Sequence, residues 1–119
     1  MPHDYDQASL HDIVGAARLI VEFVEGVDHH AFLEDAKTRS AVIHQLLIIG
    51  EAVKRLSPQL RNNHPQVPWS LIARTRDMLI HHYEAVDPEE VWRIVQGSVP
   101  DLVPTLEALM DASDEPTDQ

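Results

Sequence analysis

Residues 74–83 combine the side-chain types that acid–base and phosphate chemistry require. They include two arginines, one aspartate, two histidines and a tyrosine. A histidine can move a proton on or off the 2′-hydroxyl or the leaving oxygen of RNA. An arginine can stabilise the charge that develops on a phosphoryl group. Arg76 and His81 are therefore candidates for cleaving an RNA backbone.

Helical geometry sorts these side chains onto two faces. On an ideal helix, Arg76 and Tyr83 point along the apolar side, while Arg74, Asp77 and His81 share a different face. A carboxylate next to an imidazole can fix its tautomer, and an arginine beside them could hold a phosphate. The second face therefore carries groups that could support acid–base work by His81.

The same residues also have structural interpretations. A guanidinium on a core-facing stripe is costly without partners, so Arg76 can be the half-buried partner of a carboxylate on a neighbouring helix. Glu51 is the candidate, and it either orients Arg76 for chemistry or only packs beside it. His81, taken alone, can be a surface or capping residue. Arg76 and His81 lie about 140° apart on one helix, so they converge if the helix frays, if Arg76 wraps round, or if a second copy contributes.

Apolar periodicity predicts the helices that position this stretch. Apolar residues at three- and four-residue spacing predict a helix that begins at an N-cap, Ser9, and ends near residue 26. A second helix over 37–56 is apolar around more than half its circumference, which is typical of a central or interface helix. Its Gly50 indicates close approach by another backbone. A third helix over 69–83 carries the candidate residues.

The last helix has the clearest start. Asp87 is the predicted N-cap and Pro88 the first helical residue, and we expect a kink or break near Pro100. No segment has strand-like alternation. The predicted fold class is therefore all-α, an antiparallel bundle of four main helices in a single domain over 1–119, with flexible tails at 1–7 and 111–119.

Composition limits the chemistry and the compartment. The chain has no cysteine, which excludes disulfides, thiolate metal sites and a cysteine nucleophile, and suits a reducing cytoplasm. The N-terminal residues do not resemble a signal peptide, and no apolar run is long enough to cross a bilayer. We therefore expect a cytoplasmic protein without a membrane partner.

The charge is unevenly distributed. The net charge is −11, which argues against a general nucleic-acid coat protein. Residues 54–83 hold five basic residues and one acid, a net charge of +4, and the remainder carries −15. A polyanion could therefore meet a local positive region. Alternatively, the acidic ends are only solvated faces.

The motif and its surroundings resemble a known family. Arg76, His81 and Tyr83 match the R-x4-H-x-Y pattern of HEPN-domain toxins of the HepT type. The resemblance continues along most of the chain, in order, through Ile48-Ile49-Gly50-Glu51-Ala52, Leu56-Ser57, Val67-Pro68-Trp69, Val86-Asp87 and Val91-Trp92.

The resemblance implies a function and partners. It implies a helical bundle that forms a homodimer, with metal-independent ribonuclease activity on tRNA or mRNA in the cleft between paired motifs. Arg76 and His81 take the catalytic positions. Tyr83 takes the position to which a minimal nucleotidyltransferase antitoxin adds AMP. Asp77 stands where asparagine is common in the family and adds a negative charge near the phosphate site. The supporting residues are then Asp77, Glu51, Arg74 and His82.

The sequence also leaves room for functions other than a ribonuclease. Adjacent histidines at 29–30 and 81–82 lack a third ligand at a recognised spacing, so we expect no metal and no cofactor. A non-catalytic helical partner of a nucleotidyltransferase, which binds nucleotide or scaffolds the complex, is the main alternative. A dimer whose motif is only a buried polar network is a further one.

Overall fold

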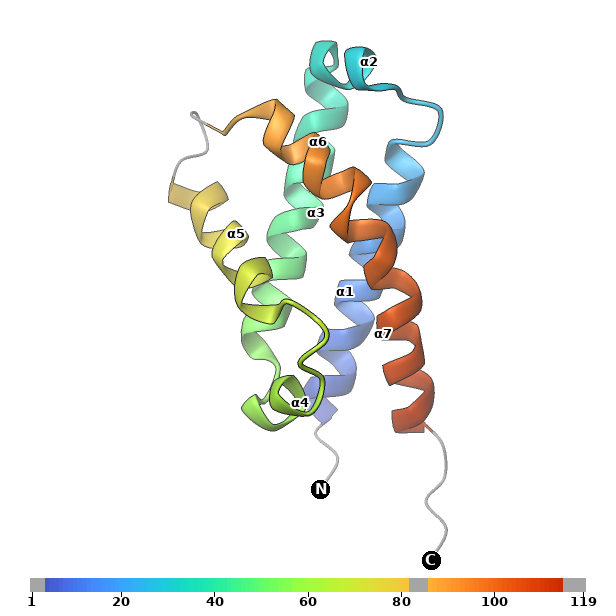
Figure 1. The fold of residues 1–119 in the computed structure, drawn as a ribbon, viewed down its shortest axis with the longest axis vertical. Helices are drawn as coiled ribbons and strands as arrows, with labels where there is room; N and C mark the ends of the chain where they lie inside the picture. Colours follow the sequence, from blue (N-terminus) through green and yellow to red (C-terminus); the bar gives the residue numbers. More distant parts are fainter. Residues whose placement is uncertain (1–3, 82–85, 115–119) are drawn as a thin grey trace, which may run out of the picture.

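The computed structural model describes residues 4–81 and 86–114, and Figure 1 shows their fold. Within these ranges all regular structure is helical, which confirms the predicted all-α class. The helices are α1 (Asp4–Phe23), α2 (His29–Glu34), α3 (Ala36–Arg55), α4 (Pro58–Asn63), α5 (Trp69–His81), α6 (Pro88–Gln96) and α7 (Ser98–Asp114). No helix in the described part is both long and apolar enough to span a bilayer.

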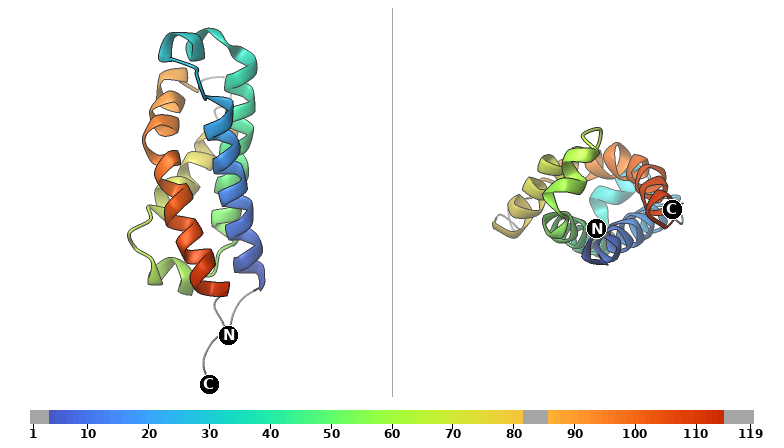
Figure 2. Two further views of the ribbon diagram at one scale, coloured as in Figure 1. Left: turned by 90° about the vertical axis from the view of Figure 1, so that its right-hand side faces the viewer. Right: turned by 90° about the horizontal axis from the view of Figure 1, so that it is seen from below.

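The long helices form an antiparallel bundle around α3. α1, α3, α5 and the α6–α7 pair run alternately up and down, with α2 and α4 at opposite ends (Figure 1). α3 packs against α1 on one side and α5 on the other, and α7 packs against α1. In the end-on view of Figure 2, α5 lies at the outer edge of the bundle. The helix with the candidate motif is therefore held mainly by α3.

Apolar side chains from all the long helices form one core. The α1 stripe and the inner face of α3 supply most of it, as their spacing predicts. The largest fully buried side chains are Phe32, Leu10, Ile13, Ile20, Ile49, Leu79, Leu106, Val42, Val53, Val91, Val95 and Val99.

Local capping defines several helix starts. Asp35 caps α3, where its carboxylate accepts hydrogen bonds from the backbone N and the hydroxyl of Thr38 at 3.1 and 2.6 Å. Asp87 caps α6 through the backbone N of Glu89 at 3.0 Å, as predicted. Each cap satisfies a backbone donor that has no partner inside its helix.

The first helix begins earlier than predicted. α1 starts at Asp4, so Ser9 is a buried helical residue and not the N-cap. Buried Asp6 accepts hydrogen bonds from the backbone N and hydroxyl of Ser57, at 2.8 and 2.7 Å. This long-range contact anchors the first turn. The predicted tails are correspondingly too long, because residues 4–7 and 111–114 are helical, while 1–3 and 115–119 lie outside the described residues.

The break in the last helix falls at Gly97, three residues before Pro100. Proline lacks an N–H, and its ring clashes with the carbonyl four residues upstream, which here belongs to Gln96. The chain therefore breaks between Gln96 and Ser98, and Pro100 falls in the first turn of α7, where no helical donor is needed.

Candidate functional site

Gly50 allows α5 to cross α3 at very short range. A Cβ built on Gly50 would lie 2.7 Å from Cγ and 3.3 Å from Cα of Arg76, and still nearer its Cβ. Only glycine fits such an approach, which confirms the close backbone contact predicted for this position. The crossing places the base of the Arg76 side chain directly on the backbone of α3.

Arg76 extends from this crossing between two carboxylates. Its Nη2 donates to Oε2 of Glu51 at 2.8 Å, and its Nη1 donates to Oδ1 of Asp77 at 3.1 Å. The side chain is 23% exposed. Its Nε is buried and has no hydrogen-bond partner in the described structure. The hydrogen bonds to Asp77 and then Glu51 raise the pKa of Arg76, so it stays cationic. Glu51 is thus the predicted ion-pair partner.

Lys54 is a member of this cluster that the sequence analysis did not single out. Its Nζ donates to the same Oδ1 of Asp77, at 2.8 Å. The hydrogen bonds from Lys54 and then Arg76 lower the pKa of Asp77. Gly50 and Lys54 are four apart on α3 and share a face, just as Arg76 and Asp77 are neighbours on α5. This spacing places Lys54 on the face of α3 that α5 crosses, but the pair itself depends on the rotation of α5, which brings Asp77 to Lys54.

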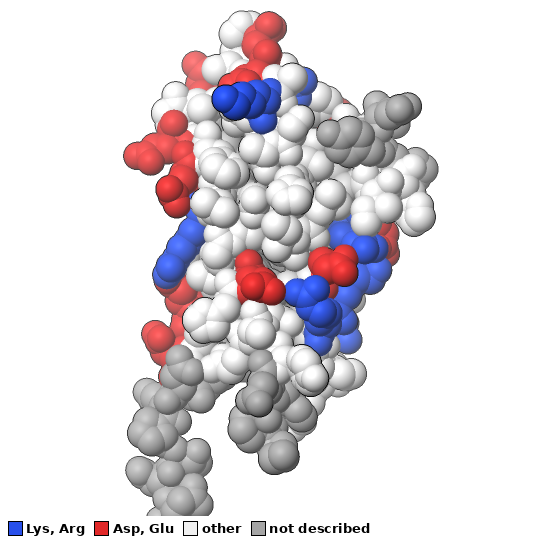
Figure 3. Space-filling view, turned by 180° about the vertical axis from the view of Figure 1, so that it is seen from behind, with Lys and Arg blue, Asp and Glu red and all other residues white. Residues whose placement is uncertain are grey.

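Ion pairs offset part of the predicted positive region. Besides the Lys54–Asp77 and Arg76–Glu51 pairs, Arg55 donates to Asp12 at 3.2 Å and lies 4.0 Å from Glu51. In Figure 3, positive and negative side chains lie against one another on this face. Two acids from outside residues 54–83, Asp12 and Glu51, therefore fold onto this region and reduce its net positive charge.

The remaining predicted residues are less constrained. His81 is exposed at the last position of α5, and it makes no hydrogen bond within the described structure. Asp77, which could have supported His81 from the same face, bonds Lys54 and Arg76, and no hydrogen bond joins it to His81 in the part of the chain that the structure describes. Arg74 is exposed. His82 and Tyr83 lie outside the described residues.

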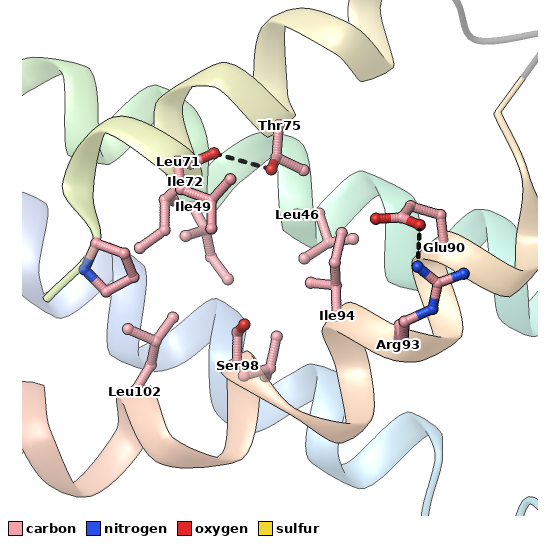
Figure 4. Close-up of a pocket in the computed structure, with 12 residues that line it drawn as sticks. Leu46, Ile49, Leu71, Ile72, Thr75, Glu90, Arg93, Ile94, Ser98 and Leu102 are labelled. Atoms are coloured by element: carbon pink, nitrogen blue, oxygen red, sulfur yellow. Dashed lines mark hydrogen bonds and ion pairs between the residues drawn. The ribbon is translucent and has the colours of Figure 1, made fainter.

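A separate cavity of about 270 Å³ lies among α3, α5, α6 and α7 (Figure 4). Its lining is mostly aliphatic, with Leu46 and Ile49 from α3. Thr75 donates its hydroxyl to the carbonyl of Leu71, and Arg93 pairs with Glu90 at 2.7 Å, so these polar groups are already used. Thr75 lies about 160° around α5 from Asp77. The cavity is therefore distinct from the Arg76 cluster.

No group of three or more potential metal ligands gathers in the part of the chain that the structure describes. Nε2 of His29 instead donates to Oε2 of Glu89 at 2.7 Å, and the ring stacks on Trp92, with ring centroids 5.6 Å apart. These contacts link α2 to α6. His29 therefore has a structural role there.

Comparisons with known proteins identify the family. The profile described as "Ribonuclease HepT-like" matches residues 13–109. "Putative RNase MJ0127" of Methanocaldococcus jannaschii is 42% identical over 110 residues, covering 92% of this chain and 91% of that protein. "Probable ribonuclease HepT" of Thermococcus cleftensis is 43% identical over 100 residues, covering 84% of this chain and 91% of that protein. No solved structure matches the chain significantly.

The matched region contains the whole of α3 and α5, and hence the Arg76 cluster. The profile and the relatives confirm the resemblance drawn from the motif, and they confirm the predicted enzyme class, a ribonuclease. The chain belongs to the HepT-like ribonuclease family.

Proposed function

We propose that this protein is the toxin of a toxin–antitoxin pair, a metal-independent endoribonuclease that cleaves tRNA or mRNA in the cytoplasm with Arg76 and His81. The observation that carries the proposal is the seating of Arg76. Its guanidinium is half-buried, fixed by Glu51 and Asp77, and mounted on a tight helix crossing. Such preorganisation suits a group that must meet developing charge without rearranging.

The proposed chemistry divides between the two side chains. His81 takes the proton from a 2′-hydroxyl, or gives one to the leaving 5′-oxygen. Arg76 stabilises the negative charge on the phosphoryl oxygens. A guanidinium carries five N–H donors, and each carboxylate occupies one donor of Arg76. Donors therefore remain on its Nη atoms for a phosphate.

A homodimer would bring the two groups together. Arg76 and His81 lie about 140° apart around one helix, so a single α5 does not aim them at one phosphate. Leu71 and Met78 are seven apart, so they share one face of α5, and they are 48% and 36% exposed. A second copy packed along α5 would cover apolar surface and supply the opposing motif. Static light scattering should give twice the chain mass.

Control of the enzyme is assigned to Tyr83. The match of Tyr83 to the last position of the motif supports it as the acceptor of AMP from a minimal nucleotidyltransferase antitoxin. A bulky anionic adduct beside the motif would block the cleft and repel RNA. Intact mass after incubation with the antitoxin and ATP should rise by one AMP in wild type and stay unchanged in Tyr83→Phe.

The activity is tested by incubating RNA with purified protein in EDTA. We expect Arg76→Ala and His81→Ala each to slow cleavage by about 10²-fold or more. Matched controls are Arg93→Ala and His30→Ala, which remove an exposed arginine and an exposed histidine from other helices. Equal cleavage by wild type and both motif variants would remove the proposal.

A non-catalytic role is the second candidate, and one observation favours it. Arg76 is already matched by two carboxylates, which is also how a purely structural arginine would look. In that case the protein would bind nucleotide or RNA, or scaffold a nucleotidyltransferase, without turnover. Arg76→Ala would then lower stability and leave toxicity in cells unchanged.

A further inference from the structure

Arg76 shares Asp77 with a second cation. Oδ1 of Asp77 accepts from Nη1 of Arg76 at 3.1 Å and from Nζ of Lys54 at 2.8 Å. Arg76, Glu51 and Asp77 alone sum to a charge of −1, and Lys54 brings these four residues to zero, while Arg55, 4.0 Å from Glu51, is itself balanced by Asp12. An acidic cluster would repel an RNA phosphate. The charge on Asp77 must therefore be balanced by something other than Arg76.

We propose that Lys54 is a positioning residue, which neutralises Asp77 so that the charge around the Arg76 guanidinium does not repel an RNA phosphate. The inference rests on the proposed ribonuclease function and assigns a role within the same site. Lys54 acts through Asp77 and does not touch substrate.

Three observations carry this role. Lys54 binds the same carboxylate oxygen as Arg76 and at the shorter distance, so it competes with Arg76 for Asp77. The same hydrogen bond lowers the pKa of Asp77, so a proton does not remove its charge near neutral pH. The side chains of Lys54 and Asp77 are also each 44% exposed, and an ion pair between exposed side chains contributes little to stability. Its main effect is therefore on the charge that Arg76 presents.

The test is a double-mutant cycle with steady-state kinetics on RNA. Lys54→Met should raise KM about tenfold and change kcat little, because phosphate binding weakens. Lys54→Arg should restore KM. Lys37→Met removes the same side chain from the other end of α3 and should leave KM unchanged. In an Asp77→Asn background no acid needs balancing, so Lys54→Met should change KM less than about twofold.

Two results would overturn the inference. An unchanged KM in Lys54→Met would remove it, and so would an equal rise in both backgrounds, which would make Lys54 a direct phosphate ligand. Melting temperatures near that of wild type exclude misfolding as the cause.

Binding separates this inference from the proposed function. The same variants are titrated with a 2′-O-methyl RNA that cannot be cleaved through its 2′-oxygen. If wild type binds the 2′-O-methyl RNA but does not cleave unmodified RNA, the ribonuclease proposal fails. The effect of Lys54→Met on affinity in the two backgrounds then still decides the inference. If wild type neither binds nor cleaves RNA, both fail.

Discussion

Replacing Gly50 with alanine tests the geometry that seats Arg76. The new Cβ would meet Cγ and Cα of Arg76 at 2.7 and 3.3 Å, against ordinary carbon contacts of about 3.5–4.0 Å. The nearest atoms form the base of the side chain and the backbone, so no flexible end can move aside. α3 and α5 must separate by roughly 1 Å to relieve the overlap.

The cost of that separation can be estimated. Overpacking of a tight contact costs about 1–3 kcal/mol, and a clash with backbone belongs at the upper end. Alanine regains about 1 kcal/mol over glycine inside a helix. The net loss is about 2 kcal/mol, or a melting temperature about 8 °C lower for a chain of this size. A displacement of about 1 Å at Arg76 should also slow RNA cleavage by about 10²-fold.

Gly15 supplies the matched control. It lies in the interior of α1, is exposed, and has no atom within 4 Å of its added Cβ. Gly15→Ala should therefore raise the melting temperature by about 4 °C, through helix propensity alone, and leave cleavage unchanged. Thermal denaturation and initial cleavage rates of both variants decide the matter. Equal stabilisation by the two substitutions, with full activity in Gly50→Ala, would refute the tight crossing.

Two further predictions concern the frame of the bundle. Gly26 has a φ of +75°, which alanine adopts only with strain, so Gly26→Ala should cost about 1 kcal/mol and lower the melting temperature by about 4 °C. An unchanged melting temperature would contradict the left-handed turn. The hydrogen bonds from Thr38 lower the pKa of Asp35 in the folded state. The stability they give is present above the unfolded-state pKa and is lost as pH falls through the folded-state pKa. Urea unfolding of Asp35→Ala between pH 2 and 7 should show less of this acid loss than wild type.

Local signals made some features predictable. The Asp87-Pro88 start of α6 is specified by neighbours in sequence, so its cap could be read directly. Gly50 indicated a close approach because glycine costs stability inside a helix unless something needs the space. The stripes of α1 and α3 gave the bundle, since amphipathic helices bury one face whatever their partners.

Features that depend on the partner helix were not predictable. The early start of α1 depends on Asp6 reaching Ser57, which is 51 residues away in sequence. The break in the last helix, by contrast, was predicted near Pro100 from local sequence alone, and it falls at Gly97 because of the proline's clash with Gln96.

The candidate site shows the same division. The Arg76–Glu51 pair could be predicted because a guanidinium on a core-facing stripe needs a partner of opposite charge. The Lys54–Asp77 pair follows from the rotation of α5 on α3, which turns Asp77 towards Lys54. Periodicity on one helix does not specify that rotation.

The central claim is that Arg76 and His81 act together on one phosphate. The most direct measurement is single-turnover cleavage of an end-labelled RNA in EDTA by wild type, Arg76→Ala, His81→Ala and the double variant. Groups that act as a unit are strongly non-additive. We predict that each single variant loses about 10²-fold or more and that the double variant loses little beyond that. Losses that multiply would show two independent roles, and undiminished cleavage in either single variant would contradict the account.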